Sequence, residues 1–197
     1  MDHLLNNGVE TTKLEAVPAI AELYRKLGFI DEYDSLRFSG NTPKFFSTQS
    51  SNVKLLKGEM IEEIAKWDAE YFGADRIKVL TSIRDESPKC CFVSYTGSKC
   101  AGYIMCRRAG IGYIAGPWVC NPEKPQVADE LLIKCMEAIG RSAKLYVGVP
   151  AVNREAVGIL QELGFKQYSK SIRMRLGKEL ETECINGIFA IGGAEKG

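Results

Sequence analysis

The side chains best suited to catalysis or metal binding are few in this sequence. Its only histidine is His3, so a Ser-His-Asp or Cys-His nucleophilic site is disfavoured. Seven cysteines are present, an odd number, and no two of them have the C-x-x-C spacing of a zinc-ligand pair. The sequence therefore predicts no metal site. It predicts instead that most of these cysteines are small buried hydrophobes in a reducing compartment.

Carboxylates gather on the helix predicted over residues 59–72. Glu62, Glu63, Asp68 and Glu70 could supply a general base that lines an acceptor pocket. An ordinary solvated helix face explains the same residues equally well, and the sequence leaves both interpretations open.

Length and charge narrow the class of protein. A chain of 197 residues can bury a sizeable core as one domain with an appendage. Its formal net charge of +1 and pI near 7.5 give no general attraction to nucleic acid or to an anionic membrane. No apolar run approaches the ~20 residues of a membrane span, and the first residues lack a signal-peptide pattern. We therefore expect a cytoplasmic protein with no nucleic-acid or membrane partner.

The segment that positions the candidate site residues is 145–165. It opens with an apolar run of strand length, which Pro150 ends. Asn153 is a good N-cap for a helix whose apolar positions, Ala156 and Leu160 among them, recur at helical spacing. Gly164 then lies where helices stop in a left-handed residue. The pattern predicts strand, turn, helix and a sharp stop.

The remaining elements surround this segment in a definite order. Helices are predicted over 59–72, 75–86 and 127–139, and strands over 53–56, 90–95, 100–107, 111–119, 167–176 and 187–191. Gly112, Gly116 and Pro117 lie inside one strand and predict a bulge, or a ligand close to the backbone. We therefore expect an α+β domain over 52–197, with a mixed, mostly antiparallel twisted sheet and helices on both faces.

Residues 1–40 predict a partial repeat, made of a strand, a helix and a strand. Shifted by 136 positions, 27–29 (LGF) falls on 163–165 (LGF), and 35–38 falls on 171–174. Chance similarity between two amphipathic helices is the alternative, but the shared register also covers the next strand. Residues 41–51 are predicted to be a linker rich in Ser, Thr and Asn. Because so short a fragment cannot hold a core, it should pack on the main domain's sheet or on a second chain's, which makes a homodimer plausible.

These features resemble a GNAT-type N-acetyltransferase domain. The order of elements in 52–197 is that of the family, and Asn153, Ala156 and Gly164-Phe165 match its N-x-x-A…G-F pattern. Residues 10–38 resemble the tail of another copy. The runs 116–119 and 189–193 are similar to tandem acetyltransferases whose C-terminal domain is a divergent GNAT domain.

The resemblance implies acyl transfer from acetyl-CoA, or another acyl-CoA, to the amine of a small molecule or peptide by direct attack. In the family the donor's pantetheine arm lies between two splayed strands, here near 116–120 and 145–149, and its pyrophosphate lies at the N-terminus of the following helix. The residues implied in binding this cosubstrate are Trp118, Val119, Cys120, Gln126, Val127, Ala128, Asn153, Ala156 and Leu160.

The sequence does not identify a catalytic acid. The tyrosine that family members often use falls on Leu160, and the pyrophosphate loop keeps only Ala128 of the family's pattern. Three other tyrosines are candidates for protonating the leaving sulfur: Tyr146, Tyr168 and Tyr24. The alternative to catalysis is a non-catalytic GNAT-like module that binds a ligand or a partner. For Asn153 itself, a structural helix cap explains the residue at least as well as contact with a ligand does.

Overall fold

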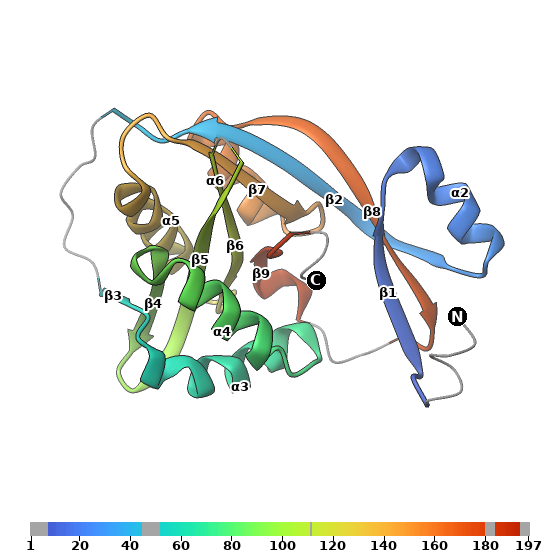
Figure 1. Ribbon diagram of the computed structural model, residues 1–197, viewed down its shortest axis with the longest axis horizontal. Coiled ribbons are helices and arrows are strands. Elements are labelled where there is room, and N and C mark those ends of the chain that lie inside the picture. Colours follow the sequence, from blue (N-terminus) through green and yellow to red (C-terminus); the bar gives the residue numbers. More distant parts are fainter. Residues whose placement is uncertain (1–7, 45–51, 111, 180–183, 194–197) are drawn as a thin grey trace.

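The strands of the protein join in one twisted sheet with the order β1-β8-β2-β7-β6-β5-β4-β3, and β9 pairs with β6 (Figure 1). The computed structural model describes residues 8–44, 52–110, 112–179 and 184–193. All pairings between named strands are antiparallel except β6 with β7, which is parallel. The strands are β1 Thr11–Ala16, β2 Ile30–Asn41, β3 Val53–Leu55, β4 Cys91–Thr96, β5 Lys99–Ala109, β6 Gly112–Cys120, β7 Lys144–Pro150, β8 Lys166–Gly177 and β9 Ile188–Ala190.

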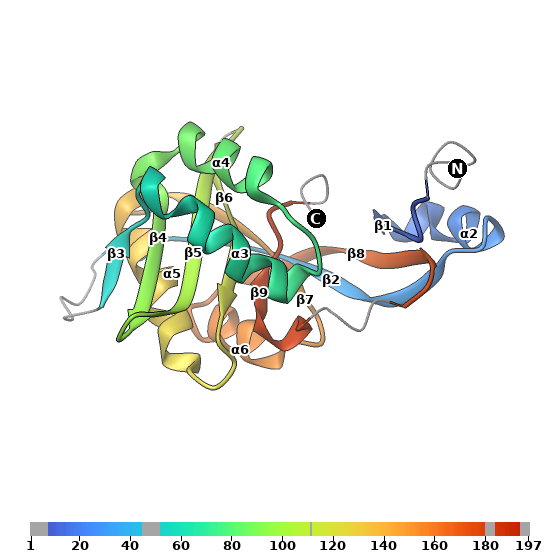
Figure 2. The ribbon, with the colours of Figure 1, turned by 90° about the horizontal axis from the view of Figure 1, so that it is seen from below.

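Helices cover both faces of the sheet, as the sequence predicts. Helices α3 (Ile61–Phe72) and α4 (Ile77–Glu86) lie on one face, and α5 (Pro125–Ile139) and α6 (Arg154–Glu162) on the other (Figure 2). Helix α2 (Pro18–Lys26) lies at the far end of the molecule. Short 3-10 turns span Gly58–Met60, Pro88–Cys90 and Ile185–Gly187. The predicted α+β class with a mixed, mostly antiparallel sheet is confirmed.

Each helical layer seals its own part of the core. Leu131 and Leu160, from α5 and α6, belong to the cluster of buried side chains on one face. Ile64 and Leu80, from α3 and α4, belong to the cluster on the other. A third and smaller cluster lies beneath α2. Among the described residues, no helix is both long and apolar enough to cross a membrane.

The predicted turn, helix and stop around Asn153 are confirmed. The Asn153 side chain accepts a hydrogen bond from the Ala156 N–H at 3.0 Å, which caps α6. The helix ends at Glu162 with Leu163 as its C-cap, and Gly164 follows with a left-handed φ of 79°. The Phe165 N–H then donates to the Leu160 carbonyl at 2.9 Å. This stop turns the chain directly into β8.

The N-terminal region is built into the main sheet. Strand β2 lies between β7 and β8, and β1 pairs with the other side of β8. The prediction that this fragment packs on the sheet of the main domain is therefore confirmed for residues 8–41. Thr42 continues the attachment, because its hydroxyl donates to the Gly140 carbonyl at 2.5 Å. Residues 45–51 of the predicted linker lie outside the described residues.

Strands β6 and β7 separate after a short parallel ladder. They pair only from Tyr113 to Ala115 on β6, opposite 145–147 on β7. The chain then passes through Gly116, where a Cβ atom would collide with the backbone carbonyl of Ile191. The sequence predicts a bulge here, or a ligand close to the backbone. The group that lies close to the backbone at Gly116 is the protein's own Ile191 carbonyl, just after β9. The ladder between β5 and β6 also shifts register here, as the glycine and proline predict.

Candidate functional site

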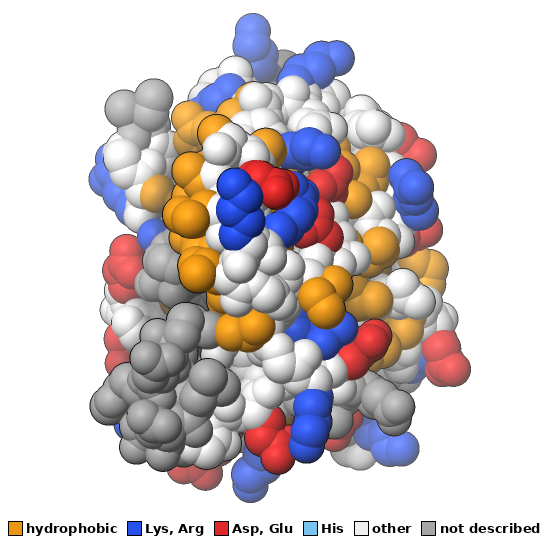
Figure 3. All heavy atoms as spheres, turned by 90° about the vertical axis from the view of Figure 1, so that its right-hand side faces the viewer, with side chains coloured by type: hydrophobic (Ala, Val, Ile, Leu, Met, Phe, Trp, Pro, Cys, Tyr) orange, Lys and Arg blue, Asp and Glu red, His pale blue; other side chains and the backbone are white. Residues whose placement is uncertain are grey.

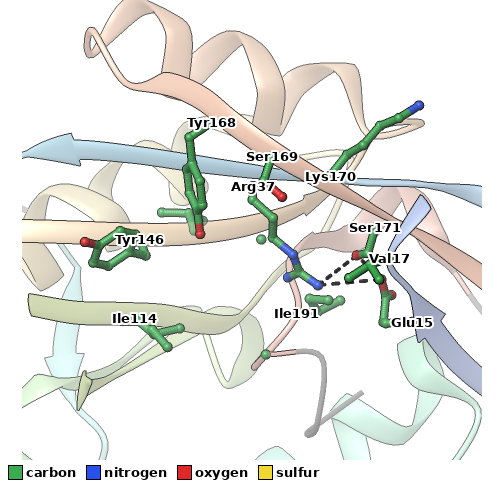
Figure 4. A pocket seen from close by; sticks show the side chains of 13 residues that line it. Glu15, Val17, Arg37, Ile114, Tyr146, Tyr168, Ser169, Lys170, Ser171 and Ile191 are labelled. Atoms are coloured by element: carbon green, nitrogen blue, oxygen red, sulfur yellow. Dashed lines mark hydrogen bonds and ion pairs between the residues drawn. The ribbon is translucent and has the colours of Figure 1, made fainter. Parts of the chain in front are cut away.

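A cavity of about 280 Å³ lies where the N-terminal strands meet the main domain (Figure 4). We call it the junction pocket. Glu15 comes from β1, Arg37 from β2, Tyr146 from β7, and Tyr168 and Ser171 from β8. Ile114 of β6 and Ile191, just after β9, complete its apolar wall. The site therefore depends on β1 and β2 as much as on the main domain.

Glu15 places a carboxylate at the inner end of the junction pocket, with only 1% of its side chain exposed. Ser35 donates to one carboxylate oxygen at 3.0 Å, and Ser171 donates to the other at 2.5 Å. Arg37 and Arg173 lie 3.6 and 3.8 Å from it. These hydrogen bonds and cations offset the cost of burying the charge, so the carboxylate is held in one position.

Arg37 brings a positive charge to the same end of the pocket. Its Nη2 donates to the Ser171 hydroxyl at 3.0 Å, which fixes the guanidinium beside Glu15 (Figure 4). Gly148 makes room for it, since a Cβ atom at this position on β7 would collide with the Arg37 Nη1. The polar end of the pocket thus presents both signs of charge.

Two of the three candidate tyrosines meet in the junction pocket. The rings of Tyr146 and Tyr168 lie edge to face, with centroids 5.9 Å apart. Tyr168 is largely exposed, and both rings line the pocket. Tyr24 lies elsewhere, on α2, where its ring packs against Phe29 at 5.7 Å. The structure therefore brings together Tyr146 and Tyr168 and separates Tyr24 from them.

The gap between β6 and β7 holds β9. Trp118 and Val119 of β6 pair with Ala190 and Ile188, and on the other side the Ile191 N–H donates to the Gly148 carbonyl at 3.0 Å. The Phe189 ring packs against Trp118 with centroids 5.0 Å apart. Strand backbone that could receive a donor arm is therefore already bonded to the chain itself.

Asn153 contacts this occupied gap directly. Besides capping α6, its side-chain amide donates to the carbonyls of Asn186 at 3.1 Å and Ile188 at 2.9 Å. The side chain is buried, and all of these partners are backbone atoms of the protein. Asn153 thus acts as both a helix cap and a clamp on the segment that leads into β9.

The other residues predicted to bind the cosubstrate fall into two groups. Trp118, Val119, Cys120, Ala156 and Leu160 are fully buried in the core. Gln126, Val127 and Ala128 lie in the first turn of α5, near a second cavity of about 280 Å³ lined by Pro125, Asn153 and Arg154. Their contact with a cosubstrate stays a prediction.

The carboxylates predicted as candidate bases do not act as one group. Glu62, Glu63 and Glu70 line a broad cavity of about 680 Å³ beside Trp67. Asp68 is fully buried instead and forms two hydrogen bonds of 2.9 Å with the Arg76 guanidinium, and Tyr103 donates to it as well. Asp68 is therefore part of the core.

The thiols of the described cysteines are mostly poor nucleophiles. Burial raises the pKa of Cys91 and of Cys100 to about 12. Burial also raises the pKa of the Cys120 thiol well above its usual range. Within the described ranges, no group of three or more His, Cys, Asp or Glu side chains is placed to hold a metal ion.

Sequence reasoning missed Glu15, Arg37 and the two serines. Ser171 is 156 positions from Glu15 and 134 from Arg37, and only the pairing of β1 and β2 with β8 brings them together. The only signal was the match between 35–38 and 171–174, because it aligns Ser35 with Ser171.

The order of the sheet, the helices on both faces and the parting of β6 from β7 define an acetyltransferase fold. Residues 64–190 match the family model described as "Acetyltransferase (GNAT) domain", which covers well over half of the chain. The chain belongs to this family.

Individual relatives agree with this assignment. The chain is 26% identical to the holothin acyltransferase of Pseudoalteromonas sp. (strain SANK 73390) over 184 residues, which are 93% of this chain and 61% of the relative. It is similar to the crystal structure of a putative acetyltransferase from Pyrococcus horikoshii, with a TM-score of 0.77, 25% identity, and coverage of 100% of this chain and 64% of that one. A GCN5-related N-acetyltransferase from Sphaerobacter thermophilus shares the fold, with a TM-score of 0.59, 12% identity, and coverage of 88% and 62%. The chain thus spans about three fifths of the length of these relatives.

Proposed function

We propose that this chain takes part in acyl transfer from an acyl-CoA, acetyl-CoA in the first instance, to an amine that binds in the junction pocket. The observation that carries the proposal is the buried Glu15 carboxylate beside Arg37, at the end of a cavity that reaches β7 next to the β6–β7 gap. Because both signs of charge are present, an amine that also bears a carboxylate, such as an amino acid or a peptide terminus, fits better than a plain alkylamine.

The proposed chemistry is direct attack. The neutral amine nitrogen attacks the thioester carbonyl carbon, and a C–N bond forms as the C–S bond breaks. The amine's proton passes to water, and coenzyme A leaves as a thiolate. Because the reference pKa of a thiol is about 8.5, the thiolate is a tolerable leaving group near neutral pH. The part that falls to Glu15 and Arg37 is to hold the acceptor in one orientation.

A second candidate function is a non-catalytic module that binds a ligand or partner in the junction pocket. The observation in its favour is β9, which pairs with Trp118 and Val119 and leaves their ladder no room for a donor. Turnover separates the two candidates.

The test of the first candidate is release of free coenzyme A thiol from acetyl-CoA in the presence of an amine panel. The panel holds amino acids, peptides, alkylamines and polyamines, with the matching alcohols as controls. Amine-dependent release that is faster with carboxylate-bearing amines is expected. Binding of the same amines, seen as thermal stabilisation without any release, would favour the non-catalytic module.

We further infer that residues 10–38 are a partial copy of the main domain, and that the chain is organised as 1–40, a linker over 41–51, and 52–197. Helices α2 and α6 are each nine residues long and start 136 positions apart, and β2 and β8 are each twelve residues long with the same separation. Ser35 pairs with Ser171, its own equivalent under this shift. Such an arrangement suits a tandem acetyltransferase.

The partial copy in residues 10–38 exposes an apolar surface on α2, whereas the equivalent surface of α6 in the main domain is buried. Ile20 and Leu23 on α2 are 44% and 58% exposed, whereas the equivalent Ala156 and Ile159 on α6 are buried. Figure 3 looks onto this end of the molecule and shows hydrophobic side chains grouped between charged ones. In the relatives, more than a third of the length lies outside the match.

We propose that in a solution of this protein without other proteins, a second copy of the chain covers the exposed face of α2 that carries Ile20 and Leu23. Analytical ultracentrifugation should then show a dimer, and Leu23→Lys should convert it to a monomer. Leu55→Lys, at a similarly exposed leucine on β3, is the control and should leave the dimer intact. A wild-type monomer at micromolar concentration would contradict the proposal.

A further inference from the structure

The protein's own chain fills the place where β6 and β7 part. We propose that this gap accepts an extended, amide-bearing chain, that residues 188–191 occupy it from within the same molecule, and that β9 and the arm of an acyl donor exclude each other. The exclusion between β9 and the donor arm rests on the proposed function. The binding of an extended peptide in the gap does not depend on it.

Backbone groups on both sides of the gap are used by the occupant. On one side Val119 pairs with Ile188 and Trp118 with Ala190, in antiparallel register. On the other side the Ile191 N–H reaches the Gly148 carbonyl at 3.0 Å. Addition of a strand between two edges is how sheets recognise extended chains, because unpaired N–H and C=O groups are costly when buried.

Asn153 recognises the occupant as backbone and not as side chain. Its amide donates to the carbonyls of Asn186 and Ile188, at 3.1 and 2.9 Å. A primary amide that reads two carbonyls places no demand on the sequence of the bound segment. It would bind the amides of a pantetheine arm by the same geometry.

Side chains then hold the segment in the gap. Phe189 is 1% exposed and packs on Trp118, and Ile188 and Ile191 are each 2% exposed. Glycine at 116 allows the Ile191 carbonyl to approach β6, where any Cβ atom would block it. Because the same edges cannot pair twice, a donor arm can enter only where β9 has left.

The direct test follows β9 by hydrogen exchange in the full chain. Addition of acetyl-CoA should lower the protection of the amides of residues 188–191, Ile191 among them. Acetyl-CoA that binds with that protection unchanged would overturn the proposal, because both would then occupy the gap together.

A variant separates the clamp from the helix cap. Asn153→Asp keeps the oxygen that caps α6 but replaces the amide donor with a carboxylate oxygen facing two carbonyls. It should loosen β9, seen as lower hydrogen-exchange protection of residues 188–191, but it also removes an amide that the donor arm would use. Phe189→Leu weakens the packing of β9 on Trp118 and leaves Asn153 in place, so it should tighten acetyl-CoA binding at least tenfold in calorimetry. Leu80→Ala, a buried change on α4, is the control for general destabilisation and should not tighten binding.

A synthetic peptide of residues 188–193 (IFAIGG) tests the site without any acyl donor. It should bind the Phe189→Leu protein, which keeps Asn153, at least tenfold more tightly than the wild type. If acetyl-CoA binds none of these proteins and the peptide does not distinguish wild type from variant, the proposal is wrong. Failure of amine-dependent coenzyme A release would refute the proposed function alone, since peptide exchange is measured without it.

Discussion

At the scale of single residues, two buried carboxylates are held in different ways. Asp68 accepts two hydrogen bonds from the Arg76 guanidinium and one from the Tyr103 hydroxyl. The charged and polar groups of these three side chains therefore have hydrogen-bond partners inside the core. Burial and the neighbouring Asp68 raise the pKa of Tyr103, which keeps it a neutral donor. Glu15 is satisfied by serines, with its arginines slightly further away, and it lines a cavity. The first carboxylate is enclosed by core side chains, whereas the second is among the residues that line the junction pocket.

Replacing Asp68 should therefore cost stability. Asp68→Asn leaves the Arg76 charge buried without its carboxylate, for which the expected loss is about 3–5 kcal/mol of unfolding free energy. Denaturant unfolding measures it. Asp75→Asn is the matched control, because the exposed Asp75 oxygen only accepts from the Ile77 N–H and an asparagine can do the same. Equal losses in both variants would contradict the assignment.

The tyrosine pair tests whether acyl transfer needs an acid. With direct attack and a thiolate leaving group, we expect Tyr146→Phe and Tyr168→Phe each to slow the chemical step less than about tenfold. Tyr24→Phe, remote from the junction pocket, should have no effect. Single-turnover rates with folding checked decide this. A loss of about 100-fold or more in one variant would identify that tyrosine as the acid.

At the scale of elements, the central feature is the antiparallel pair β2 and β8. Their register breaks twice, once where β2 has the extra residue Glu32 and once where β8 has the extra residue Tyr168. These two residues are 136 positions apart, like the strands themselves. One bulge turns Tyr168 toward the junction pocket, and the other leaves Glu32 beside a separate cavity.

Removal of residues 1–40 should destabilise the whole sheet. Strand β2 pairs with both β7 and β8, so its loss leaves two long strands with open edges. We expect the shortened chain to melt at a lower temperature or to form larger oligomers. A shortened chain that melts and sediments like the parent would show that the fragment contributes little.

At the scale of the whole molecule, features set by neighbouring residues could be predicted from the sequence. Contacts between residues far apart in the sequence could not. The α6 cap at Asn153 and its stop at Gly164 follow from neighbouring residues, and the sequence predicts them correctly. The junction pocket arises from strands far apart in the chain, so Glu15 and Arg37 carry no local signature. The short strand at 188–190 was visible as a strand, but its place between β6 and β7 depends on where that sheet parts.

Cysteine chemistry offers a test of the burial pattern across the molecule. Cys184 is exposed, whereas Cys91, Cys106, Cys120 and Cys135 are buried. A pKa of about 12 leaves Cys91 about one part in ten thousand thiolate at pH 8, and thiolate is the reactive form. Iodoacetamide at pH 8 should therefore modify Cys184 first, as read by peptide mass spectrometry. Early labelling of Cys91 in the native protein would contradict the packing around it.

A matched pair of charge-removing variants tests the proposal that the acyl acceptor binds in the junction pocket. Glu15→Gln removes the carboxylate that lines the junction pocket. Glu32→Gln removes a carboxylate that pairs with Arg173 and Arg175 and lines a separate cavity together with Lys13 and Tyr33. Steady-state kinetics with the preferred amine should show KM raised about tenfold or more by Glu15→Gln and unchanged by Glu32→Gln, since a hydrogen bond to a charged group contributes about 1.5–3 kcal/mol. An unchanged KM in Glu15→Gln, or an equal rise in both variants, would contradict the claim.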